Sequence, residues 1–230
     1  MSPAWTVSVG GDTTSAVYEP ALGGADAAVF VCAHGAGGSM ADRSVVATAR
    51  AMQARGIGVV RFNFLYKEKK RGRPDQMPVL EETVAAVVER TRAELDPKRL
   101  VIGGRSMGGR AASMLAAERY LADGLLLLAY PLHPPGKPEQ LRDAHLPKIT
   151  MPVCCFCGTR DPFVTRDLME RALERVTAPW EMHWVEGADH GFHVLKSSGR
   201  TDTAVMEEIA ETTRRWIDNA LWPGATHLSK

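Results

Sequence analysis

The stretch Gly104-Arg105-Ser106-Met107-Gly108 predicts the fold of the chain around it. It follows an apolar run at residues 100–102 and precedes a helix-forming segment at residues 110–121, which together predict a strand, a tight turn and a helix. In so tight a turn a Cβ atom at either flanking position would collide with the neighbouring backbone, and glycine avoids that collision. The side chain of Ser106 is therefore expected to stand exposed at the tip of a strand.

The length and composition are those of an ordinary globular chain. With 230 residues, of which 45% are hydrophobic and 24% charged, we expect a single domain over residues 1–230. The formal net charge of +1 gives no indication of nucleic-acid binding. No apolar run approaches the roughly 20 residues that span a bilayer, and the first residues lack a secretory signal. We therefore expect neither a membrane nor a nucleic acid as partner, and the oligomeric state stays open.

Three of the four cysteines, Cys154, Cys155 and Cys157, fall in one predicted strand. A metal or redox site is the alternative, but the C-x-x-C spacing lies inside a strand and not at a helix start. We interpret these three residues and Cys32 as small buried hydrophobic residues with free thiols. Free thiols are typical of a reducing compartment, so the expected location is the cytoplasm.

Strand and helix patterns alternate along the chain. An N-terminal hairpin and six further strands are predicted at residues 5–9, 13–18, 27–33, 57–62, 100–103, 125–130, 153–157 and 182–185. Helical periodicity lies between most of them, with Gly56 as the expected C-cap of the first helix and Thr165 as the expected N-cap of a later one. The alternation predicts an α/β fold with a mostly parallel sheet of about eight strands and helices on both faces. Residues 130–152 are the only insertion large enough for a flap, so we expect a minimal cap.

A serine hydroxyl becomes a nucleophile only with a base that takes its proton and a third group that orients the base. Asp161 directly follows the cysteine-rich strand, and His190 directly follows the last strand. The topology thus delivers Ser106, Asp161 and His190 to one edge of the sheet. Asp189 is the rival orienting acid, although a sequence neighbour usually points away from the ring. The alternative role for Asp189 is to brace the loop. His193 is expected to be structural or to lie at the pocket rim.

Acyl transfer also creates a negatively charged oxygen, which requires donors aimed at it. The backbone N–H of Met107, the residue after the serine, is the first candidate. The second is the backbone N–H of Ala36, in the glycine-rich loop that follows the strand at residues 27–33. His34 is expected to shape this loop through hydrogen bonds.

The same glycine loop has a rival explanation as a dinucleotide-binding turn. The fit is poor, because Met40 stands at the third glycine position and no acidic ribose ligand follows the next strand. A Walker A loop is absent. His190 and His193 are three residues apart but lack a third metal ligand. We therefore expect no cofactor and no metal.

With these residues assembled, the chain resembles the α/β-hydrolase superfamily across nearly its whole length, in the small, lid-poor branch related to dienelactone hydrolase. The segments at residues 61–64 and 131–138 resemble those of a subgroup that includes bacterial proteins of unknown substrate. That subgroup also resembles the hydrolase-like domain of a regulatory subunit of a chromatin complex. The resemblance implies Ser106 as nucleophile, Asp161 as orienting acid and His190 as base. Dienelactone hydrolases proper use a cysteine nucleophile, so the serine weakens any inference of that particular reaction.

Three further residues, His34, Asn63 and His133, follow predicted strands and are candidate pocket residues. Holding loops in place is the alternative for each. The basic loop at residues 67–73 carries five positive charges and one negative charge. It is interpreted as a solvated loop, with recruitment of an acidic substrate or partner as the alternative.

Two functions are compatible with these features. The first is a serine hydrolase that cleaves a small carboxylic ester or thioester through an acyl-enzyme. The second is a binding or scaffold protein that keeps the fold without the chemistry, since a fold alone does not fix a function. The presence of all three triad residues and both oxyanion loops favours the enzyme.

Overall fold

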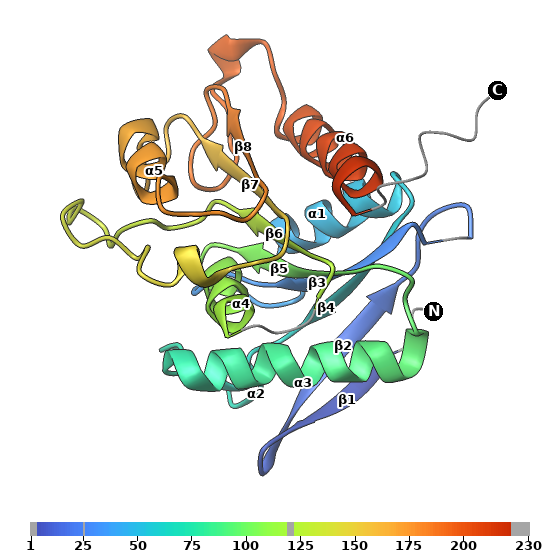
Figure 1. The fold of residues 1–230 in the computed structure, drawn as a ribbon. Helices are drawn as coiled ribbons and strands as arrows, with labels where there is room; N and C mark the ends of the chain where they lie inside the picture. The colour runs from blue at the N-terminus through green and yellow to red at the C-terminus, as the bar shows by residue number, and fades with distance from the viewer. Residues whose placement is uncertain (1–3, 25, 119–121, 222–230) are drawn as a thin grey trace.

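The computed structural model describes residues 4–24, 26–118 and 122–221. At its centre lies a sheet of eight strands in the order β1-β2-β4-β3-β5-β6-β7-β8 (Figure 1). Their bounds are β1 (Ala4–Val9), β2 (Asp12–Glu19), β3 (Ala28–Ala33), β4 (Ile57–Phe62), β5 (Leu100–Arg105), β6 (Gly124–Leu128), β7 (Val153–Gly158) and β8 (Trp180–Val185). The hairpin β1–β2 pairs antiparallel with β4, and all other neighbours are parallel. The predicted hairpin and mostly parallel sheet are confirmed.

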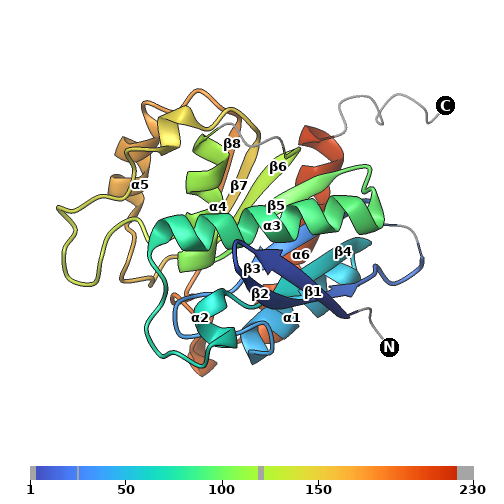
Figure 2. The same ribbon diagram turned by 90° about the horizontal axis from the view of Figure 1, so that it is seen from below.

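Helices cover both faces of this sheet, as predicted (Figures 1 and 2). One core cluster joins the sheet to α3 (Met77–Leu95), α4 (Met107–Ala117) and α5 (Arg166–Leu173). The other joins the opposite face to α1 (Arg43–Gln53) and α6 (Asp202–Ala220). Because both faces are covered, every residue of the five central strands β3 to β7 is buried, which explains their continuous apolar sequences.

The buried cysteines fit this packing. All four lie in β3 or β7, and none forms a disulfide. Burial raises the pKa of the Cys32 thiol to about 12, although Arg105 and Arg61 oppose the rise. The thiol is therefore protonated and unreactive at neutral pH, as its interpretation as a small hydrophobic residue requires.

Several element boundaries differ from the prediction. Helix α4 begins at Met107 and not at residue 110, because the tight turn passes directly into the helix. The end of the predicted helical segment, residues 119–121, lies outside the described residues. Helix α1 ends at Gln53 with Ala54 as its cap, and Gly56, with φ of 75°, closes the turn that follows. A short helix α2 (Leu65–Glu68) occupies a segment where no helix was predicted. The cap at Thr165 is confirmed, since its hydroxyl accepts the Leu168 N–H at 3.4 Å.

The segment at residues 130–152 is irregular and carries only one turn of 3-10 helix (Leu146–Lys148). It is tied to the body of the protein, because the His133 N–H donates to the Phe163 carbonyl at 3.2 Å and the His145 Nε2 atom lies 2.8 Å from the Ser113 Oγ atom on α4. Within the segment, the Tyr130 hydroxyl donates to the Arg142 carbonyl at 2.6 Å. The predicted minimal cap is therefore a closely held flap. No helix within the described ranges is long and apolar enough to cross a membrane.

Candidate active site

Ser106 lies at the turn between β5 and α4 with φ of 48° and ψ of −116°. A non-glycine residue in such a conformation costs about 1 to 3 kcal/mol, so the surrounding structure must enforce it. The neighbours explain why. A Cβ atom at Gly104 would lie 2.2 Å from the Ala33 carbonyl oxygen, and one at Gly108 would lie 2.6 Å from the His34 carbonyl oxygen. The collision predicted for the flanking positions is confirmed, and it allows β5 and α4 to pack closely against the end of β3.

A continuous line of hydrogen bonds joins Ser106, His190 and Asp161. The His190 Nε2 atom lies 2.9 Å from the Ser106 Oγ atom, and its Nδ1 atom lies 2.7 Å from the Asp161 Oδ2 atom. Because an ionised carboxylate only accepts, the neutral ring carries its proton on Nδ1 and leaves Nε2 to accept from the serine hydroxyl. The three residues come from the ends of β5, β7 and β8, as the topology predicted.

The Asp161 carboxylate is the buried end of this line. Its side chain is fully buried, whereas the His190 side chain is 26% exposed. The second carboxylate oxygen accepts the Phe163 N–H at 2.9 Å, which fixes the orientation of the group. The Phe163 ring also packs against the His190 ring, with ring centroids 4.4 Å apart. Water therefore reaches the histidine and not the acid.

The rival acid, Asp189, braces the loop that carries His190. One of its carboxylate oxygens accepts the backbone N–H groups of Gly191 at 2.8 Å and His193 at 3.0 Å. The His193 ring instead pairs with Asp202, with 2.6 Å between Nδ1 and Oδ2. These contacts fit the loop-bracing alternative for Asp189 and a structural role for His193.

The glycine-rich loop after β3 lies against the serine. A Cβ atom at Gly35 would lie 3.6 Å from the Ser106 Cβ atom. The Ala36 carbonyl accepts the Tyr66 hydroxyl at 2.7 Å, which holds the peptide of this residue. Met107 is the first residue of α4, where the N–H groups have no acceptor within the helix. Both candidate donor residues therefore belong to segments that adjoin Ser106, one in the loop after β3 and one at the start of α4.

The three candidate pocket residues are engaged in loop contacts. His34 is fully buried; its Nδ1–H donates to the Gly35 carbonyl at 2.8 Å and its Nε2 accepts the Phe64 N–H at 3.1 Å. Burial lowers the pKa of His34, in spite of the hydrogen bond to Gly35. The Asn63 amide accepts the Met40 N–H at 2.9 Å and donates to Glu68 at 2.9 Å. His133 is buried, with Nδ1 2.9 Å from the Pro134 carbonyl oxygen. These bonds favour the loop-holding alternative.

Two residues at the site were not singled out from the sequence. Phe163 carries no sequence signal, because its contact with His190 arises only from the fold. Arg105 does carry one, since it is a charged residue at the end of an otherwise apolar buried strand. Its Nη2–H donates to the His190 carbonyl at 3.2 Å, so it holds the loop of the histidine from behind.

The basic loop is partly neutralised by local partners. The Lys69 ammonium forms an ion pair with Asp12 at 2.5 Å, and Arg71 pairs with Asp75 at 2.6 Å. These pairs fit a solvated loop. Among the residues that the structure describes, no group of three or more His, Cys, Asp or Glu side chains is arranged to hold a metal ion.

Comparison with known proteins agrees with this architecture. Residues 26–218 match the family described as "Alpha/beta hydrolase domain", and the chain belongs to that family. An uncharacterized protein from Mycobacterium tuberculosis is 30% identical over an alignment of 208 positions, which covers 83% of this chain and 72% of that protein.

Solved structures with a similar fold are more distant in sequence. A serine hydrolase without a lid from Xanthomonas campestris has a TM-score of 0.74 at 23% identity, over 94% of each chain. Dienelactone hydrolase from Anabaena variabilis has a TM-score of 0.72 at 22% identity, over 96% of this chain and 98% of that one. At these identities the likeness establishes the α/β-hydrolase fold, and it agrees with the resemblance drawn from the sequence.

Proposed function

We propose that this chain is a serine hydrolase that cleaves a carboxylic ester or thioester of a small molecule through an acyl-enzyme on Ser106. The observation that carries the proposal is the hydrogen-bonded line from Ser106 Oγ through His190 to the buried Asp161, with distances of 2.9 and 2.7 Å. Such a line supplies a nucleophile, a base of the correct tautomer and an acid that stabilises the charged ring.

In the proposed first step, the Ser106 oxygen attacks the substrate carbonyl carbon while His190 Nε2 takes the hydroxyl proton. The carbonyl oxygen becomes an oxyanion, for which the Met107 and Ala36 N–H groups are the proposed donors. When the tetrahedral intermediate collapses, the bond to the alcohol or thiol breaks, and His190 gives its proton to the leaving group. The acyl group then remains on Ser106.

In the second step, a water molecule gives a proton to His190 and attacks the acyl carbon. Collapse returns the proton to Ser106 and releases the carboxylic acid. Asp161 keeps its negative charge throughout and stabilises the imidazolium in both steps. Neither step of this scheme uses a cofactor. The minimal flap favours an open pocket and a soluble ester over a lipid interface.

A fluorophosphonate probe tests the proposal, because it reacts only with a serine that an adjacent base activates. We expect mass spectrometry to find the probe on Ser106 in the wild-type chain and to find none in Ser106→Ala. Ser113→Ala serves as the matched control, because Ser113 also contacts a histidine yet lies outside the proposed site. A folded wild-type chain that fails to react would favour the binding or scaffold alternative.

A further inference from the structure

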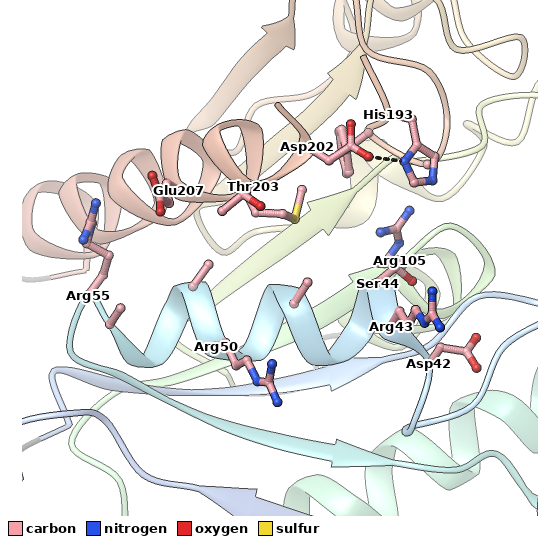
Figure 3. Close-up of a pocket in the computed structure, with 16 residues that line it drawn as sticks. Asp42, Arg43, Ser44, Arg50, Arg55, Arg105, His193, Asp202, Thr203 and Glu207 are labelled. Carbon is pink, nitrogen blue, oxygen red and sulfur yellow. Dashed lines mark hydrogen bonds and ion pairs between the residues drawn. The ribbon is translucent and has the colours of Figure 1, made fainter. Parts of the chain in front are cut away.

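A groove between α1 and α6 opens beside the loop of His190 (Figure 3). Its volume is about 770 Å³. Small or flexible apolar side chains form its walls, namely Ala47 and Ala51 on α1 and Met206 on α6. Phe192 and Arg105 line it as well, whereas Ser106 and His190 do not. The groove is therefore separate from the candidate active site, although Arg105 adjoins both.

Arg105 is the one charged residue in the lining of this groove that is buried. It is only 8% exposed, and its guanidinium has one hydrogen bond to the His190 carbonyl and a contact with the Phe192 ring at 5.5 Å. Among the described residues, no carboxylate approaches it within the 4.0 Å of an ion pair. Asp42, Asp161 and Asp189 influence it only from farther away.

The other charged groups of the groove differ from Arg105 in exposure or pairing. Asp202 pairs with His193 at 2.6 Å, and Arg55 pairs with Glu211 at 2.7 Å. The remaining charges lie toward the rim: Arg43, Arg50 and Glu207 are exposed and Asp42 is half-buried. Figure 3 shows the Arg105 guanidinium between the start of α1 and His193, facing the groove. Arg105 is thus the buried cation of the groove that has no ion pair.

A buried guanidinium is unfavourable unless its charge and its N–H groups are matched. Arginine has five N–H donors in a planar fork, and one carbonyl oxygen satisfies only one of them. A carboxylate accepts two N–H groups of this fork in parallel and brings the missing negative charge. The alanine and methionine walls suit a hydrocarbon chain, because its burial there removes apolar surface from water.

We propose that the groove binds an amphiphilic monocarboxylate, with the carboxylate on Arg105 and the hydrocarbon chain between α1 and α6. The same guanidinium holds the His190 carbonyl, so a bound carboxylate acts on the loop that carries the histidine. The binding is independent of the proposed function, whereas an effect on turnover rests on it.

Isothermal titration calorimetry of the full chain with octanoate tests the binding. We expect a Kd of about 1 mM or below for octanoate, and binding at least about tenfold weaker for acetate, which lacks the chain, and for octanol, which lacks the charge. Arg105→Gln is expected to weaken octanoate binding by about tenfold or more, since a charge-assisted pair is lost. Arg90→Gln is the matched control, because Arg90 pairs with Glu94 on α3, away from the groove.

A second variant keeps the test decisive if Arg105→Gln does not fold. Ala51→Phe fills the groove from the wall of α1 and leaves the guanidinium in place, and it is expected to weaken octanoate binding by about tenfold or more. The proposal is overturned if octanoate fails to bind, if octanol binds equally well, or if Ala51→Phe binds like the wild type. Octanoate binding by a chain that does not react with the fluorophosphonate would reject the hydrolase and keep the groove. A chain that reacts with the fluorophosphonate but does not bind octanoate would reject the groove and keep the hydrolase.

Discussion

Two hydrogen-bonded serine–histidine pairs lie in the part of the chain that the structure describes, and the distances between their paired atoms are almost equal. At the sheet edge, the Ser106 Oγ atom lies 2.9 Å from the His190 Nε2 atom. Between α4 and the flap, the Ser113 Oγ atom lies 2.8 Å from the His145 Nε2 atom. In the second pair the Ser113 hydroxyl donates to the Arg110 carbonyl at 2.8 Å, so its oxygen accepts the Nε2–H of His145. The hydrogen bond therefore runs from histidine to serine, opposite to that of the first pair.

The surroundings of the two pairs explain this difference. Asp161 holds the proton of His190 on Nδ1, whereas Arg110 lies near His145 and disfavours a second positive charge. Ser113 is fully buried, while His190 reaches solvent. Burial lowers the pKa of His145 to about 4. The distance alone does not make a nucleophile; the carboxylate, the tautomer and the access of substrate do.

Replacing each histidine by alanine gives the sharpest contrast. His190→Ala removes the proposed base, and we expect turnover of a short-chain chromogenic ester to fall by about 10⁴-fold. His145→Ala removes only a contact of the flap, and its turnover is expected to stay within about threefold of the wild type. Ester hydrolysis by both variants, with circular dichroism as the check of folding, measures the difference. Equal losses of turnover in the two variants would contradict the assignment of His190 as the base.

The acid is the second feature that separates the pairs. Asp161→Asn takes away the acceptor that sets the tautomer of His190, and turnover is expected to fall by about 10²- to 10⁴-fold with little change in KM. Asp189→Asn is the matched control; Asp189 lies in the loop that carries His190, and its substitution loosens two backbone N–H contacts and is expected to cost about tenfold or less. Steady-state kinetics of both variants with one ester decides. A larger loss in Asp189→Asn would transfer the orienting role to that residue.

The pH dependence of stability provides the smallest and most specific contrast. Because the pKa of His145 is about 4 in the fold and about 6.5 when unfolded, the unfolded chain takes up the proton first as the pH falls. The contribution of His145 to the free energy of unfolding is therefore fully present above pH 6.5. It is lost between about pH 6.5 and 4, and its magnitude is about 2 to 3 kcal/mol.

Urea unfolding of the wild type and of His145→Gln, at a series of pH values across this window, measures the effect. The difference in the free energy of unfolding between the two chains is expected to narrow toward pH 4. A constant difference would show that the ring is not held neutral by its burial near Arg110.

The succession of strands and helices along the chain and the place of the site were predictable, because each depends on a local pattern. Continuous apolar runs require strands that are covered on both faces, and the glycines beside Ser106 require a turn with no room for a Cβ atom. The boundaries were less predictable. The start of α4 at Met107 and the end of α1 at Gln53 depend on how the chain leaves the sheet, which no local periodicity encodes.

The sequence by itself determined the α/β topology and the three residues that the strand ends carry to one edge of the sheet, because hydrophobic periodicity and turn chemistry are local. Tertiary structure alone decided between the pocket and loop-holding alternatives for Asn63 and His133, and that Asp189 binds backbone N–H groups. It also decided that Arg105 is buried beside a groove without an ion pair. Those properties depend on which side chains approach one another across long sequence separations. Hydrogen-bond direction, burial and charge pairing are fixed only when those distant segments pack together.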